Sequence, residues 1–234
     1  MGKHNMSKRS KAVREQLDAE KLYELPEAVA AVKQAATAKF DETIELAIKL
    51  DVNPSKGEQS VRGVLTLPHG TGKTPRVVVF ARGEAAVEAE EAGADRVGAE
   101  ELVQEIDKGW SEFDILVAHP EVMRIVGRLG KKLGPRMPNK KAGTLDTNVG
   151  RVVRELKEGR VAFKMDKGAV LHVPVGKASF EPQQLQDNIR ALLDAVVRAR
   201  PASLKGRYIV SIALSSTMGP GIRIDPREAS AVAA

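Results

Sequence analysis

Residues 70–80 read Gly70-Thr71-Gly72-Lys73-Thr74-Pro75-Arg76-Val77-Val78-Val79-Phe80, and they mark the place where the pattern of the chain changes. Two glycines and a proline end the preceding segment, and the apolar run over 76–80 predicts a short, fully buried strand. Before this stretch the pattern is typical of antiparallel strands, whereas after it strands and helices alternate. The stretch therefore predicts a boundary between two domains.

Upstream of the boundary, apolar residues recur every three to four positions over 26–38 after a proline, which predicts a helix. Residues 43–50 alternate between polar and apolar side chains, which predicts a half-buried antiparallel strand. Its inward side chains are Ile44, Leu46, Ile48 and Leu50. Turn residues at 53–57 separate it from a second strand over 61–67.

Downstream of the boundary, three short apolar segments alternate with three helical ones, which predicts a parallel, doubly wound sheet. The strands are expected over 76–80, 95–97 and 114–118, and the helices over 84–92, 100–107 and 121–129. A further helix over 148–157 is expected to take Thr147 or Asp146 as its N-terminal cap.

After Gly159 the antiparallel pattern returns. Residues 160–164 and 169–175 are predicted to be paired strands, 183–200 an amphipathic helix stopped by Pro201, and 207–215 a final strand. The expected fold class is therefore α/β with two domains. Residues 1–70 and 159–234 form one α+β, split-βαβ sandwich from both chain ends. Residues 71–158 form an inserted Rossmann-like domain.

Composition limits the class of partner. Among 234 residues, 42% are hydrophobic, and Lys plus Arg outnumber Asp plus Glu by 37 to 31, a net charge of +6. This excess of positive charge either favours a polyanionic partner or reflects a basic surface that has no such partner. No apolar run approaches the ~20 residues that span a bilayer, and residues 1–14 are polar, unlike a secretory signal. The chain has no cysteine. We expect a cytoplasmic protein with no membrane and no disulfide partner.

The distribution of charge is uneven. Lys3, Lys8, Arg9, Lys11 and Arg14 precede the first acidic residue and form a basic arm. Residues 122–145 contain no acid but include Arg124, Arg128, Lys131, Lys132, Arg136, Lys140 and Lys141. Both segments fit either a phosphate backbone or an ordinary solvated surface. The acidic segment 84–105 is expected to face away from RNA. One Trp, two Tyr and five Phe argue against a platform of aromatic rings that stacks on bases. If the protein binds nucleic acid, it is therefore expected to recognise the shape and the backbone of that nucleic acid.

No catalytic or cofactor site is indicated. The segment 70–74 resembles a phosphate-binding loop, but that spacing requires glycine where Leu67 stands, and a strand follows instead of a helix, so we interpret it as a hinge. His4, His69, His119 and His172 are scattered, which argues against a metal site. No nucleophile elbow of the Gly-x-Ser-x-Gly type is present.

Two loop edges are candidates for binding. Residues 215–221, Ser-Ser-Thr-Met-Gly-Pro-Gly, place the long apolar side chain of Met218 among small residues at the end of a strand. Residues 39–43 similarly place Phe40 between charges just before a strand. Both fit simple turns, but an apolar side chain in such a loop also suits a partner that packs on it.

Seven short motifs follow one another along nearly the whole chain: 37–43 (Thr-Ala-Lys-Phe-Asp-Glu-Thr), 61–63 (Val-Arg-Gly), 67–70 (Leu-Pro-His-Gly), 91–95 (Glu-Ala-Gly-Ala-Asp), 133–136 (Leu-Gly-Pro-Arg), 175–180 (Val-Gly-Lys-Ala-Ser-Phe) and 216–219 (Ser-Thr-Met-Gly). Together they resemble the bacterial large-subunit ribosomal protein L-one family, the protein of the mobile stalk. The resemblance implies a ribosome-bound, non-enzymatic protein that binds the stalk region of large-subunit rRNA. It also implies help in releasing deacylated exit-site tRNA and repression of its own operon mRNA.

The resemblance further implies which residues form the RNA face. They are Lys39, Phe40, Thr43, Glu45, Asp166, Lys167, His172, Lys177, Ser211, Thr217, Met218 and Gly219. The lysines would neutralise phosphates, and the hydroxyls would bond to the RNA backbone or to 2′-hydroxyl groups. Glu45 and Asp166 would orient a lysine, accept a hydrogen bond from RNA, or remain plain surface carboxylates.

One segment departs from the family pattern, in which Gly-Pro-Arg is followed by Gly-Leu-Met-Pro-Asn-Pro-Lys. Here Gly134-Pro135-Arg136 continues as Met137-Pro138-Asn139-Lys140, so the loop is two residues shorter and more basic. Two other classes of function stay open on the residues alone. A nucleotide-binding enzyme would use the central α/β domain, and a DNA-binding regulator would carry a helix-turn-helix, for which we see no pattern.

Overall fold

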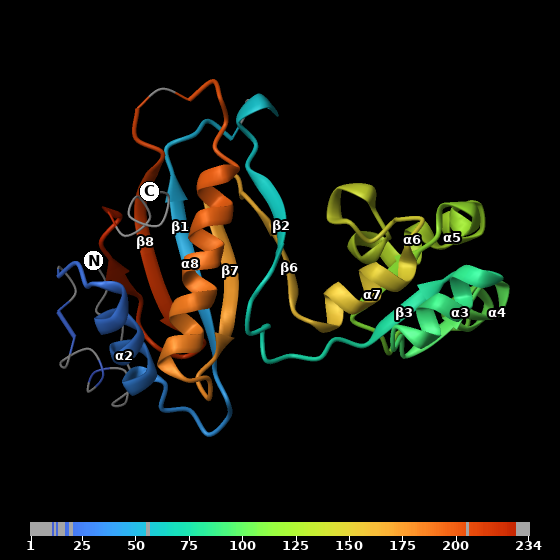
Figure 1. The fold of residues 1–234 in the computed structure, drawn as a ribbon, viewed down its shortest axis with the longest axis horizontal. Helices are drawn as coiled ribbons and strands as arrows, with labels where there is room; N and C mark the ends of the chain where they lie inside the picture. The colour runs from blue at the N-terminus through green and yellow to red at the C-terminus, as the bar shows by residue number, and fades with distance from the viewer. Residues whose placement is uncertain are drawn as a thin grey trace, which may run out of the picture. The chain divides into compact units, whose positions relative to one another are not determined.

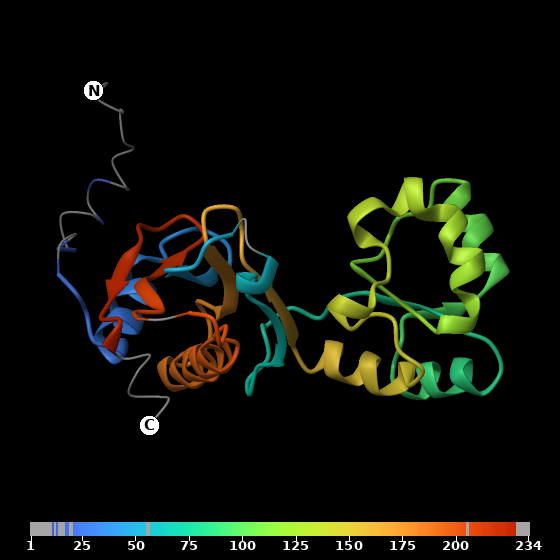
Figure 2. The same ribbon diagram turned by 90° about the horizontal axis from the view of Figure 1, so that it is seen from above.

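The computed structural model describes residues 11, 13, 17, 18, 21–54, 57–204 and 206–227. The basic-arm residues Lys3, Lys8, Arg9 and Arg14, and Ser55 and Lys56 of the predicted turn, lie outside the described residues. The chain forms two compact units, residues 1–72 with 161–234 and residues 73–160. The mixed α/β class is confirmed, and Figures 1 and 2 show the elements of each unit.

A four-stranded sheet organises the unit made from both chain ends. Its strands are β1 (Thr43–Leu50), β7 (Val170–Lys177), β8 (Ile209–Ser216) and β9 (Ile222–Ile224), in the order β7-β1-β8-β9, and neighbouring strands are antiparallel. Apolar and polar residues alternate in β1, whose buried positions fall on every second residue as predicted. Consequently one face of the sheet is buried and apolar, whereas the other is more exposed and carries the polar residues of β1.

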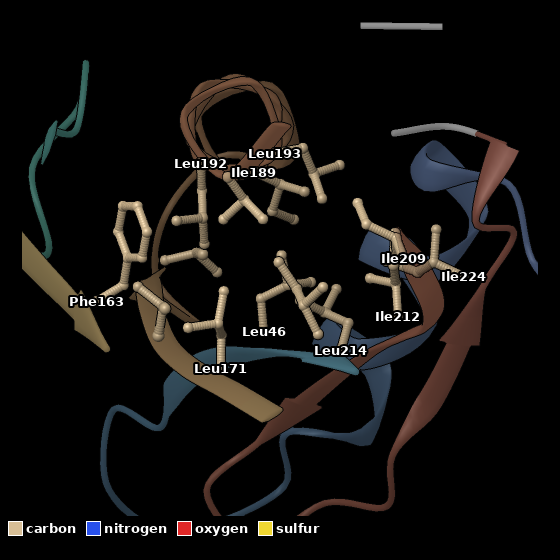
Figure 3. Packing of buried hydrophobic residues seen from close by; sticks show 14 of the residues in the cluster. Leu46, Phe163, Leu171, Ile189, Leu192, Leu193, Ile209, Ile212, Leu214 and Ile224 are labelled. Carbon is tan, nitrogen blue, oxygen red and sulfur yellow. The ribbon is translucent and has the colours of Figure 1, made fainter. Parts of the chain in front are cut away.

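Two helices cover the apolar face. They are α2 (Leu25–Ala35) and α8 (Pro182–Arg198). In Figure 3, Ile189, Leu192 and Leu193 of α8 point toward the strands, where Leu46 and Leu214 meet them. Because these side chains are fully buried, every substitution to a smaller residue here leaves a cavity.

A buried asparagine side chain connects α8 to the sheet and to the turn at 67–70. Asn188 of α8 is fully buried, and its side-chain nitrogen donates to the carbonyls of Val175 at 2.8 Å and Gly70 at 3.0 Å. Its side-chain oxygen accepts from the backbone N–H of His69 at 3.0 Å. The side chain therefore anchors the turn at 67–70 to the sheet and the helix.

One strand pairing predicted from the sequence is wrong. β6 (Arg160–Lys164) pairs with β2 (Arg62–Thr66) in a separate two-stranded sheet, whereas β7 joins β1. A turn at 166–169, in which Ala169 has a φ of 58°, redirects the chain between β6 and β7. Alternation of polar and apolar residues shows that a segment is a strand but does not identify the strand with which it pairs. The short connection between β6 and β7 wrongly suggested that these two strands pair with each other.

The inserted unit is built on a parallel sheet. Its strands are β3 (Val77–Phe80), β4 (Arg96–Gly98) and β5 (Ile115–Ala118), in the order β4-β3-β5. Val77 and Val79 enter one apolar cluster with α3 (Glu84–Glu91) and α7 (Val149–Lys157), whereas Val78 and Phe80 enter another with α4 (Glu100–Asp107). Both faces of the sheet are thus covered, which is the doubly wound arrangement.

Two local predictions in this unit need correction. The segment expected as one helix over 121–129 is a succession of short turns, namely η2 (Pro120–Val122), α5 (Met123–Val126), η3 (Gly127–Leu129), α6 (Gly130–Leu133) and η4 (Gly134–Arg136). Gly127 and Gly130 interrupt it because glycine is a poor helix former. The cap of α7 is Asn148, whose side chain accepts from the backbone N–H of Arg151, rather than Thr147 or Asp146.

Candidate nucleic-acid interface

The face of the four-stranded sheet that points away from α2 and α8 carries rows of polar and charged side chains mixed with small apolar ones. Residues directly opposite each other in antiparallel strands project on the same side. From the Thr43 end, the outward rows are Pro174–Glu45–Ser215, His172–Ala47–Ala213–Arg223 and Val170–Lys49–Ser211. The register therefore brings Glu45, His172 and Ser211, predicted from three separate segments, onto one surface.

Sequence reasoning missed two cations on this face. Lys49 lies opposite Ser211 and is exposed, and its ammonium donates to the carbonyl of Gly168. Arg223 lies opposite Ala213 and is exposed. The outward position of Lys49 in the alternating strand was the available signal, whereas Arg223 required β9, which was not predicted.

Three chain segments meet at the Thr43 end of the sheet. They are the loop 36–42 before β1, the residues 177–180 that end and follow β7, and the loop 216–221 after β8. A register shift between Ile44 and Glu45 leaves Lys177 opposite Thr43. The Lys177 ammonium donates to the Thr43 hydroxyl at 2.8 Å and to the carbonyl of Asp41 at 3.4 Å. This lysine is thus held beside the loops with N–H capacity to spare.

Two large apolar side chains are exposed in these loops. Phe40 is 55% exposed and Met218 is 56% exposed. Among the residues that the structure describes, five large apolar side chains are exposed, and Phe40 and Met218 are the two that lie in the loops at this end of the sheet. Two such side chains in neighbouring loops indicate a contact surface. Lys39, next to Phe40, is also exposed.

Thr217 and Gly219 make contacts within the protein that hold the loop 216–221 in place. The Thr217 hydroxyl accepts from the Thr43 backbone N–H at 3.0 Å and lies 3.3 Å from the Thr43 carbonyl, to which it donates. It keeps one lone pair for a ligand. A methyl group at Gly219 would collide with the Ser216 hydroxyl. A side chain at position 219 would therefore require the Ser216 hydroxyl to move.

Asp166 and Lys167 lie at the other end of the sheet. Asp166 Oδ1 accepts from the backbone N–H groups of Val170 and Gly168, both at 2.8 Å, and these bonds, that of Val170 foremost, hold the pKa of its carboxyl below the ordinary value. Asp166 thus forms the turn that exposes Lys167. The six-residue step along β1 from Thr43 to Lys49 separates the two ends by about 20 Å at ~3.3 Å per residue. The predicted residues form an elongated strip rather than one cluster.

The pocket described in the inserted unit does not lie where a doubly wound sheet binds nucleotides. Doubly wound sheets bind nucleotides at the carboxyl ends of their strands. A pocket of about 710 Å³ in this unit is instead lined by Arg76, Asp95 and Glu112, at or near the amino ends. The segment 70–74 leads into β3, with φ values of 65° at Gly70 and 70° at Gly72. No helix begins there to cradle a phosphate.

The basic segment of the inserted unit is partly neutralised. Lys132 forms an ion pair with Asp107, and Arg136 lies 5.7 Å from the ring centroid of Phe113. Arg124, Arg128 and Lys131 are described without an ion pair, and all three are exposed. Within the described ranges, no group of three or more His, Asp and Glu residues is placed to hold a metal ion. In the same part of the chain, no helix is long and apolar enough to cross a membrane.

Comparison with known proteins agrees with the ordered motifs. The sequence model of the Ribosomal protein L1p/L10e family matches residues 32–220. A curated relative, the "Large ribosomal subunit protein uL1" of Protochlamydia amoebophila, is 50% identical over 229 residues, which cover 97% of this chain and 97% of the relative. The chain therefore belongs to the ribosomal protein L1p/L10e family, as its motifs predicted, and is a structural rather than an enzymatic protein.

Proposed function

We propose that this constituent of the large ribosomal subunit binds the stalk region of large-subunit rRNA through the outward face of the β7-β1-β8-β9 sheet and the loops at its Thr43 end. The family assignment confirms the expected location, on the ribosome in the cytoplasm. The unit made from both chain ends then acts as the RNA-binding domain.

One observation carries this proposal: the register of β1 with β7 and β8. It aligns Glu45, His172 and Ser211 on a face that no described helix covers, with Lys49 and Arg223 beside them. A strip about 20 Å long, at ~3.3 Å per strand residue, matches a run of successive phosphates better than a single small ligand.

Each kind of side chain has a distinct role toward RNA. Lys39, Lys167 and Lys177 neutralise phosphates, and Thr43, Ser211 and Thr217 bond to the sugar–phosphate backbone. Phe40 and Met218 pack on an exposed sugar or base. Glu45 accepts from a 2′-hydroxyl or a base amine, whereas Asp166 acts through the turn that presents Lys167.

The motif resemblance extends the proposal to two further RNAs, exit-site tRNA and the protein's own operon mRNA. An mRNA fold that imitates the rRNA stalk would use the same strip, so the two RNAs would compete for one surface. Repression then occurs when free protein exceeds free rRNA. Contact with exit-site tRNA would assist the release of deacylated tRNA.

A binding titration tests the proposal. The protein is titrated with a stem-loop from the rRNA stalk, with duplex DNA of the same sequence as the competitor, at several salt concentrations. We expect the RNA to bind more tightly than the DNA, with log affinity falling linearly as log salt rises because neutralised phosphates release counterions. Equal affinity for both, or a flat salt response, would contradict the proposal.

A further inference from the structure

A carboxylate lies buried where the proposed interface is assembled. Glu42 stands directly before β1 and is only 1% exposed. Glutamate is almost never buried to this degree unless its charge is compensated. Neither the family motifs nor charge patterning gave this residue a role separate from its neighbours.

Three contacts of Glu42 join three separate segments. Its Oε1 accepts from the backbone N–H of Ala38, and its Oε2 accepts from the backbone N–H of Met218, both at 2.8 Å. Its backbone carbonyl accepts from the N–H of Ala178, also at 2.8 Å. The three donors lie next to or within the segments that carry Lys39, Phe40, Lys177, Thr217, Met218 and Gly219.

We infer that Glu42 is the positioning residue of this interface: its carboxylate holds the loop before β1 and the loop after β8 in the relative arrangement that RNA requires. The consequence for RNA binding rests on the proposed function, whereas the coupling of the two loops rests on the contacts within the protein. Glu42 itself is not a contact residue, because its carboxylate is covered.

The chemistry of the side chain explains why glutamate is needed. An ionised carboxylate offers two acceptor oxygens and no donor, so it satisfies two N–H groups at once with charge-assisted hydrogen bonds. Glutamine has nearly the same shape but only one acceptor oxygen. Its NH₂ group would face one of the two N–H donors, so one loop would lose its anchor.

The decisive variant is Glu42→Gln, compared with Glu27→Gln as a matched control. Glu27 lies on α2 of the same unit, and its exposed side chain pairs with Lys21. Two quantities are measured: hydrogen exchange at the amides of Ala38, Met218 and Ala178, and affinity for the rRNA stem-loop. The Ala178 amide is an internal control, since its acceptor is the backbone of residue 42.

We expect Glu42→Gln to accelerate exchange at Ala38 or Met218, to leave Ala178 protected, and to weaken RNA binding roughly tenfold, the scale of one lost hydrogen bond to a charged group. Glu27→Gln should change neither quantity. A folded Glu42→Gln protein with wild-type exchange, or with wild-type RNA affinity, would overturn the inference.

A measurement on the unmodified protein covers the case in which Glu42→Gln does not fold. The amides of Ala38 and Met218 should both be protected in the free wild-type protein, although both lie outside regular elements. Exchange of either amide at the rate of an open chain would overturn the inference. If the wild-type protein binds no stem-loop, the proposed function fails, and the exchange data alone then decide whether Glu42 couples the loops.

Discussion

Met218→Ala separates a binding surface from a structural turn. Complete burial of a methionine side chain contributes ~1.5–3 kcal/mol, and 56% of Met218 is exposed in the free protein. RNA that covers this exposed part gains about 1 kcal/mol, which corresponds to a fivefold change in Kd at ~1.4 kcal/mol per factor of ten. Truncation should therefore weaken binding of the rRNA stem-loop about fivefold.

Stability should fall by much less than for a core methionine. The buried part of Met218 contributes about 1 kcal/mol by the same reasoning, whereas truncation of a core methionine costs ~2–5 kcal/mol. The assay combines chemical denaturation with a stem-loop titration. The control is Val87→Ala on α3 of the inserted unit, because Val87 is also 56% exposed. Unchanged stem-loop affinity for folded Met218→Ala, or equal losses of affinity for both variants, would refute the reasoning.

Three other substitutions test separate parts of the strip. Gly219→Ala should lower the free energy of unfolding by about 1–3 kcal/mol because its methyl group meets the Ser216 hydroxyl. In denaturant titrations, the additional substitution Ser216→Ala should restore the free energy of unfolding. A double variant as unstable as Gly219→Ala would contradict the packing role. Lys177→Ala should lower the slope of log affinity against log salt by about 1, the value for one lost phosphate contact, and an unchanged slope would remove Lys177 from the phosphate contacts. Asp166→Asn should lower the thermal midpoint at neutral pH. The pKa of Asp166 is lowered from its ordinary value of 3.8, so the ionised carboxylate stabilises the folded state at pH values above 3.8. That stabilisation is lost as pH falls through the folded-state pKa, so the midpoints of the two proteins should converge in acid; a gap independent of pH would contradict the assignment.

Periodicity predicted most of the elements because burial on one face leaves a clear pattern. β1 and α4 occur over the residues expected from alternation and helical spacing. β9 was missed because three residues carry too little pattern. The partner of β6 was also missed, since pairing depends on tertiary packing. The ring of Phe163 in β6 occupies the space beside Gly63 in β2, and the sequence alone does not show this contact.

The sequence identified residues of the candidate site but not the contacts that these residues make with one another. The sequence indicated Met218 and Phe40 as apolar residues in polar loops, and both are exposed. It offered no means to see that Thr217 bonds to the backbone of Thr43 or that Gly219 is packed against Ser216, since both contacts join segments that only the sheet brings together. The role of Glu42 could not be predicted for the same reason, because its two hydrogen-bond donors, Ala38 and Met218, are 4 and 176 residues away in sequence.

We propose the outward face of the β7-β1-β8-β9 sheet as the RNA-binding surface of this protein. The most direct measurement is hydroxyl-radical footprinting of the full-length protein with and without the rRNA stem-loop. We expect protection at residues 39–49, 166–177 and 211–219, with none on the acidic helices α3 and α4. Protection centred on α3 and α4, or no protection of the sheet face at saturating RNA, would contradict it.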